Sequence, residues 1–241
     1  MPAPSDTVTP ELLTVDSTDF ARAAARRLAL EIRRVLESQE RCALALAGGS
    51  TPRPVYEQLA AESAGSDAWS RIDVYFGDER CVPPDDPASN YRMVRESLLE
   101  RVALDRGRVH RMEGERWDHD AAALAYEGLL PRRLDLLILG LGADGHTASL
   151  FPGAPSLAET RRRVLAVQGP GPVVDRLTIT PPVILEARLT VGLVAGADKA
   201  EALARVVAGA YEPRRTPGQL ARAGLWITDR AAAARLGAAR P

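Results

Sequence analysis

The segment over residues 134–148 constrains the fold of this chain more than any other. It begins with an apolar run over residues 134–139 and breaks at Gly140 into a glycine-rich turn, a pattern typical of a buried strand that ends abruptly. The turn then places an acid, Asp144, two residues before a histidine, His146. Since imidazole can take up and return a proton near neutral pH, the segment predicts a chemical site at the end of a buried strand.

Short apolar strands alternate with helical segments along the rest of the chain. Strands are predicted at 41–47, 72–76, near Val109, and at 164–167, 176–180, 189–194 and 225–228, with helices at 20–36, 52–62, 90–101, 118–129, 198–208 and 229–236. This alternation predicts parallel pairing through right-handed crossovers, and hence a doubly wound, mainly parallel α/β sheet flanked by helices, which is Rossmann-like. A chain of 241 residues suits a single α/β domain over 1–241.

Composition excludes several classes of function. The net charge of −1 predicts no nucleic-acid partner, and no apolar run approaches the roughly 20 residues that cross a bilayer, so we expect no membrane partner. Residues 1–6 lack the basic and apolar regions of a signal peptide. Cys42 and Cys81 form no C-x-x-C pair, which favours reduced thiols in a cytoplasmic protein.

Ligands of such a sheet bind beyond the carboxyl ends of the strands. The segments that follow predicted strands are 48–51, 77–80, 140–146 and 195–199, and they hold most of the clusters of glycine with polar residues in the chain. We therefore expect the site at the carboxyl ends of the strands, built from these loops.

The first loop, Gly48-Gly49-Ser50-Thr51, leads directly into a predicted helix. Free backbone N–H groups and the positive end of the helix dipole make such a turn an anion site, to which the two hydroxyls add donors. The Walker pattern is absent, which favours a simple phosphate over a nucleoside triphosphate. The alternative is a helix cap without a ligand.

The second loop places two acids and an arginine at a strand end. Arg80 is a candidate for bidentate phosphate binding, while Asp78 or Glu79 could orient it or contact sugar hydroxyls. The alternative is a surface ion pair. Arg176 and Lys199 are further cation candidates, although either could be an ordinary solvated residue and sequence spacing does not bring them together.

The third loop has two competing interpretations. Residues 140–145 satisfy G-x-G-x-x-G after a strand, but the dinucleotide fingerprint requires a helix to continue from the third glycine, and the prolines in 151–155 prevent one. The other interpretation makes His146 a base that acts on water, with Asp144 either fixing the imidazole tautomer or forming the turn. His110 lies in a basic stretch with no acid at useful spacing, and no metal-binding pattern is present, so we expect no metal and no cofactor.

Several motifs together resemble one enzyme family. They are Ala47-Gly-Gly-Ser-Thr-Pro52, Phe76-Gly-Asp-Glu-Arg80 with Ser89-Asn-Tyr91, Gly140-Leu-Gly-Ala-Asp-Gly-His-Thr-Ala-Ser-Leu-Phe-Pro152, Arg176-Leu-Thr and Trp226-Ile-Thr-Asp229. Their order and coverage are similar to 6-phosphogluconolactonase, of the glucosamine-6-phosphate isomerase/6-phosphogluconolactonase family. One departure is Pro181-Pro-Val-Ile-Leu-Glu186, where lactonases usually show Leu-Pro-Val-Leu-Asn-Ala.

The resemblance implies hydrolysis of 6-phospho-D-glucono-1,5-lactone in the oxidative pentose phosphate pathway, by a cytoplasmic monomer or small homo-oligomer. It implies that the substrate phosphate is surrounded by Gly49, Ser50, Thr51, Arg80, Arg176 and Lys199, and that His146 is the catalytic base. Two alternatives stay open. One is a glucosamine-6-phosphate deaminase, which carries glutamate where this chain has Phe151 and Asp-Glu-Tyr where it has Asp78-Glu79-Arg80. The other is a sugar-phosphate-binding protein without catalysis.

Overall fold

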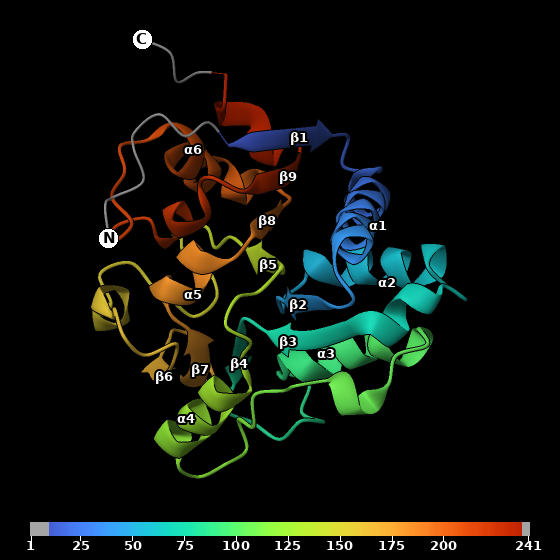
Figure 1. Ribbon diagram of the computed structural model, residues 1–241. Coiled ribbons are helices and arrows are strands. Elements are labelled where there is room, and N and C mark those ends of the chain that lie inside the picture. The colour runs from blue at the N-terminus through green and yellow to red at the C-terminus, as the bar shows by residue number, and fades with distance from the viewer. Residues whose placement is uncertain (1–9, 238–241) are drawn as a thin grey trace.

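A computed structural model of the chain describes residues 10–237 (Figure 1). Residues 1–6, where no signal peptide is expected, lie outside the described residues. The main sheet contains six parallel strands in the order β1-β9-β8-β5-β2-β3. They are β1 (Glu11–Val15), β2 (Cys42–Leu46), β3 (Ile72–Phe76), β5 (Leu136–Gly140), β8 (Leu189–Val194) and β9 (Leu225–Asp229). The predicted fold class is confirmed.

Helices cover both faces of this sheet (Figure 1). The first group is α1 (Phe20–Ser38), α2 (Pro52–Glu62) and α3 (Asn90–Ser97), and the second is α4 (His119–Leu129), α5 (Pro181–Glu186) and α6 (Ala200–Ala208). Short 3₁₀ turns lie at 67–71, 99–101, 106–108, 155–158, 197–199, 217–221 and 232–235. Strand β5 shows why both faces need cover: Leu136 and Ile138 belong to one core, and Leu137 and Leu139 to the other. Within residues 10–237 no helix combines the length and apolar character needed to span a membrane.

A second, smaller sheet lies beside the first. It pairs β4 (Asp78–Arg80), β7 (Asp175–Ile179) and β6 (Val164–Gln168), in that order and antiparallel throughout. The strands predicted at 164–167 and 176–180 are therefore antiparallel neighbours outside the main parallel sheet. Only residues 169–174 separate β6 from β7, which is too short for a parallel crossover and suits a hairpin.

Five further differences from the predicted elements are local. The edge strand β1 is mostly exposed and shows little apolar pattern, and α5 begins with two prolines that only a first helical turn tolerates. The helix predicted at 90–101 ends at Ser97 and continues as a 3₁₀ turn, and the helix predicted at 229–236 is only a 3₁₀ turn. The strand predicted near Val109 is a single bridge to β3.

The order of the strands determines where a ligand can bind. From β2 the chain moves outward to β3, and then returns to place β5 on the other side of β2. At such a switch point the connections leave the sheet in opposite directions and open a crevice beyond the carboxyl ends of the two strands. Residues 48–51 follow β2, and residues 141–146 follow β5. Both loops thus meet at this crevice.

Gly192 of β8 faces Trp226, its partner on β9, and a Cβ atom added at Gly192 would overlap the buried indole. We predict that Gly192→Ala lowers the free energy of unfolding by about 1–3 kcal/mol, the usual cost of overpacking. Gly128→Ala is the matched control, because its added methyl meets nothing within 4 Å on a helix, where alanine is favoured by about 0.5–1 kcal/mol. The changes in the free energy of unfolding of the two variants, measured by urea unfolding, should have opposite signs. Equal stability of both variants would contradict this account of the packing.

Candidate active site

A cavity of about 190 Å³ lies at the crevice between β2 and β5. It is lined by all the residues predicted to bind substrate and by the predicted base: Gly48, Gly49, Ser50, Thr51, Asp78, Arg80, Arg176, Lys199 and His146. The structure therefore brings together loops that lie up to 150 residues apart along the chain. Asp144 does not line the cavity, but its carboxylate contacts the imidazole Nδ1 of His146.

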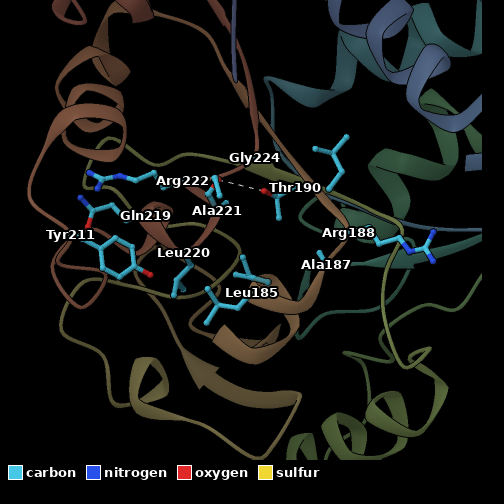
Figure 2. Close-up of a pocket in the computed structure, with 13 residues that line it drawn as sticks. Leu185, Ala187, Arg188, Thr190, Tyr211, Gln219, Leu220, Ala221, Arg222 and Gly224 are labelled. Carbon is cyan, nitrogen blue, oxygen red and sulfur yellow. Dashed lines mark hydrogen bonds between the residues drawn. The ribbon is translucent and has the colours of Figure 1, made fainter. Parts of the chain in front are cut away.

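A second cavity, of about 200 Å³, opens at the opposite, amino ends of β8 and β9 (Figure 2). Several of its polar side chains are already hydrogen-bonded within the protein. The Arg222 guanidinium donates to carbonyls at the end of α6, and the Gln219 side chain bonds three backbone groups. The Thr190 hydroxyl donates to the Ala221 carbonyl (Figure 2). Without converging polar groups, and at the wrong end of the sheet, it is the poorer candidate for catalysis.

The loop over 48–51 presents the amino end of α2 to the cavity. Pro52 is the first residue of the helix. Within residues 10–237, the backbone N–H groups of Gly49, Ser50 and Thr51 donate to no other backbone group. Among the described residues, the Thr51 side chain makes no hydrogen bond that caps α2. These donors, together with the dipole of α2, suit an anion.

Arg80 and Arg176 face each other across β4 and β7. Arg80 donates one bond to the Ala88 carbonyl at 2.6 Å, and Arg176 donates one to Pro170 at 2.9 Å. The Nε atoms of both are buried without a hydrogen-bond partner among the described residues. Burial and the positive charge of Arg80 lower the pKa of Arg176 below the ordinary value of arginine. An anion between the two guanidiniums would relieve this repulsion and use the remaining donors.

Asp78 occupies the wall of the cavity next to this pair. Its carboxylate accepts a bond from the Ser149 hydroxyl at 2.7 Å and another from the Asn90 amide at 3.2 Å. The Asn90 amide also donates to the Asp78 carbonyl at 2.9 Å, and Asn90 itself lines the cavity. Sequence reasoning missed both Asn90 and Ser149 as individual site residues, because their partner is distant along the chain.

Glu79 points the other way, as alternate residues of a strand must. It is buried, and its carboxylate accepts the backbone N–H groups of Asn90 and Tyr91 at 2.7 Å each and the Ser89 hydroxyl at 3.1 Å. Burial raises the pKa of Glu79 despite bonds from these backbone donors, which favour its charged form. Of the two acids considered for substrate contact, only Asp78 reaches the cavity, whereas Glu79 caps α3.

His146 is held by Asp144 in two ways. The imidazole Nδ1 lies 2.6 Å from the Asp144 carboxylate, and the same oxygen accepts the His146 backbone N–H at 3.1 Å. Asp144 therefore both forms the turn and orients the ring. A proton on Nδ1 leaves Nε2 free to accept a proton. Gly142 must be glycine, because a Cβ atom there would occupy the position of the ring.

Phe151 lies between the histidine and the arginine pair. Its ring centroid is 4.9 Å from that of His146, and the Arg176 guanidinium lies 5.8 Å from the Phe151 ring centre. From this point the chain enters a 3₁₀ turn at 155–158, and no α-helix connects β5 to β6. The dinucleotide interpretation therefore fails here, since its phosphate site requires a helix after the third glycine.

Lys199 also lines the cavity, with its ammonium 3.1 Å from the Asp198 carboxylate. Its loop is held in place by Asp229, which is buried and accepts hydrogen bonds from Gly196, Ser17 and Ala232.

Outside the site, one expectation is corrected: His110 does have an acid within reach, because its Nε2 lies 3.4 Å from Asp73 on β3. Among residues 10–237 no group of three or more His, Cys, Asp or Glu side chains is placed to hold a metal ion.

Comparison with known proteins identifies the family. The family model for glucosamine-6-phosphate isomerases/6-phosphogluconolactonase matches residues 15–227. A 6-phosphogluconolactonase from Streptomyces coelicolor is 39% identical over 249 residues, with 95% of both chains covered. One from Synechocystis is 38% identical over 202 residues, which cover 78% of this chain and 82% of that relative. The chain belongs to the glucosamine-6-phosphate isomerase/6-phosphogluconolactonase family.

Solved structures support the same assignment of fold. The crystal structure of 6-phosphogluconolactonase from Thermotoga maritima has a TM-score of 0.81 at 27% identity, over 92% of this chain and 100% of that one. A monomeric glucosamine-6-phosphate deaminase has a TM-score of 0.80 at 23% identity, over 93% of this chain and 99% of that one. The second likeness concerns the fold alone, so the two activities must be distinguished by the site.

The Asp144–His146 contact predicts a pH-dependent contribution to stability. Burial would raise the pKa of Asp144, but the His146 backbone N–H and the charge and ring of His146 together lower it. A carboxylate of lowered pKa stabilises the folded state above its ordinary value of about 3.9, and loses that effect as pH falls through the lowered value. Asp144→Asn should therefore be less stable than wild type at pH 7, with the difference shrinking at pH 3. Urea unfolding at both pH values measures it, and a constant difference would contradict the assignment.

Proposed function

We propose that this chain hydrolyses 6-phospho-D-glucono-1,5-lactone to 6-phospho-D-gluconate, as a 6-phosphogluconolactonase of the oxidative pentose phosphate pathway. One observation carries the proposal: the cavity that His146 lines also holds two facing arginines whose buried Nε atoms lack partners. An anion-binding end and a base in one small cavity suit a substrate with a phosphate at one end and an ester carbonyl at the other.

The phosphate end is built from two kinds of donor. Arg80 and Arg176 supply charge, while the N–H groups of residues 49–51 and the hydroxyls of Ser50 and Thr51 supply directed hydrogen bonds. Lys199 adds a further cation. Holding the phosphate converts the attack at the other end of the sugar into a reaction within one complex, which lowers its entropic cost.

At the carbonyl end, His146 Nε2 takes a proton from water as the water oxygen forms a bond to C1. The resulting tetrahedral centre collapses with cleavage of the bond from C1 to the ring oxygen, which receives the proton back from the imidazolium. Asp144 keeps Nδ1 protonated and stabilises that imidazolium while it exists. No metal or cofactor is needed in this sequence of steps.

The deaminase activity of the same family is the main alternative, and Phe151 argues against it. A ring-opening isomerisation requires a proton-transferring carboxylate, and in this chain the position is occupied by an aromatic ring packed beside His146. Arg80 likewise replaces a tyrosine of the deaminase pattern and contributes to the phosphate end. A binding protein without catalysis would retain the arginines but would have no use for an oriented imidazole.

We further propose that the enzyme is a single cytoplasmic domain with no nucleic-acid or membrane partner. The two free thiols support a reducing compartment. They give no support to a catalytic role for cysteine. Cys42 and Cys81 are both free, and burial, with the nearby charges of Asp175 and Glu79, raises the pKa of Cys81 to about 12. Neither cysteine lines the cavity.

Removing the base should abolish most of the chemistry. We predict that His146→Ala lowers kcat by at least about 10²-fold, the usual scale for loss of a general base. His119→Ala is the control, since His119 lies at the start of α4 and does not line the cavity. Lactone hydrolysis must be followed at short times, above the spontaneous background. Near-normal turnover by a folded His146→Ala protein would remove the central role, and ammonia release from glucosamine 6-phosphate would favour the deaminase.

Removing one arginine of the pair should act differently. Arg176→Ala should mainly raise KM, because a phosphate held equally in the ground and transition states contributes to binding and not to turnover. Arg161→Ala, at an exposed position outside the cavity, should leave KM unchanged. Steady-state kinetics of the lactonase reaction separate the two parameters. An unchanged KM in Arg176→Ala would count against the phosphate site.

A further inference from the structure

The outer face of α4 is apolar and uncovered. The helix packs on β6 and β7 through its inner face, where Ala122, Ala123 and Tyr126 are buried (Figure 1). Its opposite face is exposed and carries Asp120 near its amino end. The apolar residues of that face, together with the residue that precedes the N-cap, are Trp117, Ala121, Leu124, Ala125, Gly128 and Leu129. We call these six residues the α4 outer face. They recur at the spacing that forms one stripe along a helix.

This stripe holds an unusual share of the exposed apolar surface. Among residues 10–237, six large hydrophobic side chains are exposed, and three of them lie here: Trp117 at 93%, Leu124 at 59% and Leu129 at 50%. A helix that is apolar on both faces is typical of one covered on both faces. An indole alone offers about 150–250 Å² for burial, so leaving Trp117 in water forgoes a substantial gain. A concentrated patch of this kind marks an interaction surface.

The charges at the two ends of the stripe indicate what covers it. Asp118 and Asp120 are exposed at the amino end of α4, and Arg132 and Arg133 are exposed just beyond its carboxyl end. A second copy of the same helix, laid antiparallel, would set the acids of each copy beside the arginines of the other. The face is therefore complementary to itself under a two-fold axis, as an isologous contact requires.

The shape of the α4 outer face also suits an antiparallel copy of the same helix. The small residues Ala121, Ala125 and Gly128 leave the middle of the stripe flat, so that two helices can approach closely. Beside Leu129 lies a groove of about 320 Å³, with Leu99, Leu104 and Val109 among its walls. An antiparallel copy carries its own Trp117 to this end of the helix, where the groove has room for an indole.

We propose that the α4 outer face is the interface of a two-fold symmetric dimer of this chain, with the two α4 helices antiparallel and centred near Leu124 and Ala125. None of the six residues lines the candidate active site, which is complete within one copy. The dimer thus rests on observations independent of the proposed function. Activity per chain should be the same for monomer and dimer.

Sedimentation velocity over a range of protein concentrations tests the interface. Wild type should sediment as a concentration-dependent dimer, and Leu124→Glu should remain a monomer, because the two-fold axis sets the new carboxylates close to one another. Leu185→Glu is the matched control, since Leu185 is an exposed leucine on a different helix, α5, at 43%. Unchanged lactone hydrolysis shows that each variant is folded. A wild-type protein that stays monomeric at all concentrations, or a Leu124→Glu protein that dimerises normally, overturns the proposal.

A charge exchange tests the antiparallel arrangement. Asp120→Arg and Arg132→Asp should each weaken dimerisation by roughly three- to tenfold, since each creates two like-charged contacts of the size of surface ion pairs. Mixing the two variants should restore association, because the mixed dimer pairs opposite charges at both ends. If the mixture associates no better than either variant alone, the antiparallel arrangement is wrong.

Discussion

The site depends on a three-residue strand that carries acids facing opposite ways. In β4, Asp78 and Arg80 point into the cavity while Glu79 points into the protein, where it bonds the first N–H groups of α3. The carboxylate at the amino end of α3 benefits from the helix dipole, which offsets part of the cost of burying it. This contact joins the small sheet to α3, and α4 joins it as well by packing on β6 and β7. The antiparallel pairing of β4 with β7 then sets Arg80 opposite Arg176.

The groups proposed to bind the phosphate and the group proposed to act at the ester carbonyl lie in different parts of the cavity, as the phosphate and the carbonyl lie at different ends of the proposed substrate. The two arginines lie where β4 and β7 pair, and His146, the proposed base, lies in the loop after β5. Phe151 lies between these regions and contacts a member of each. Because the Phe151 ring has no exchangeable proton, this position places no second proton-transferring group between the arginine pair and His146. This is the physical feature that separates the proposed lactonase from a deaminase of the same fold.

Most of the cavity could be predicted from short segments, since the residues that line it follow strand ends. Gly48 to Thr51, His146 and Lys199 all lie where a parallel sheet places its ligands. Arg176 is different, because it begins a strand, and only the antiparallel pairing of β7 with β4 brings it opposite Arg80. Asn90 and Ser149 could not be assigned individually, because each acts through Asp78 from a distant part of the chain.

The sequence by itself determined the class of sheet and the edge at which the candidate site forms, and it singled out His146 as the candidate base. These follow from local periodicity, from glycine turns and from the Asp-Gly-His spacing, which act over a few residues. Only the tertiary structure decided that a second, antiparallel sheet exists, that Glu79 caps a helix while Asp78 reaches the cavity, and that α4 leaves an apolar face uncovered. Strand pairing and burial depend on contacts between distant segments, and no local pattern encodes which of them meet.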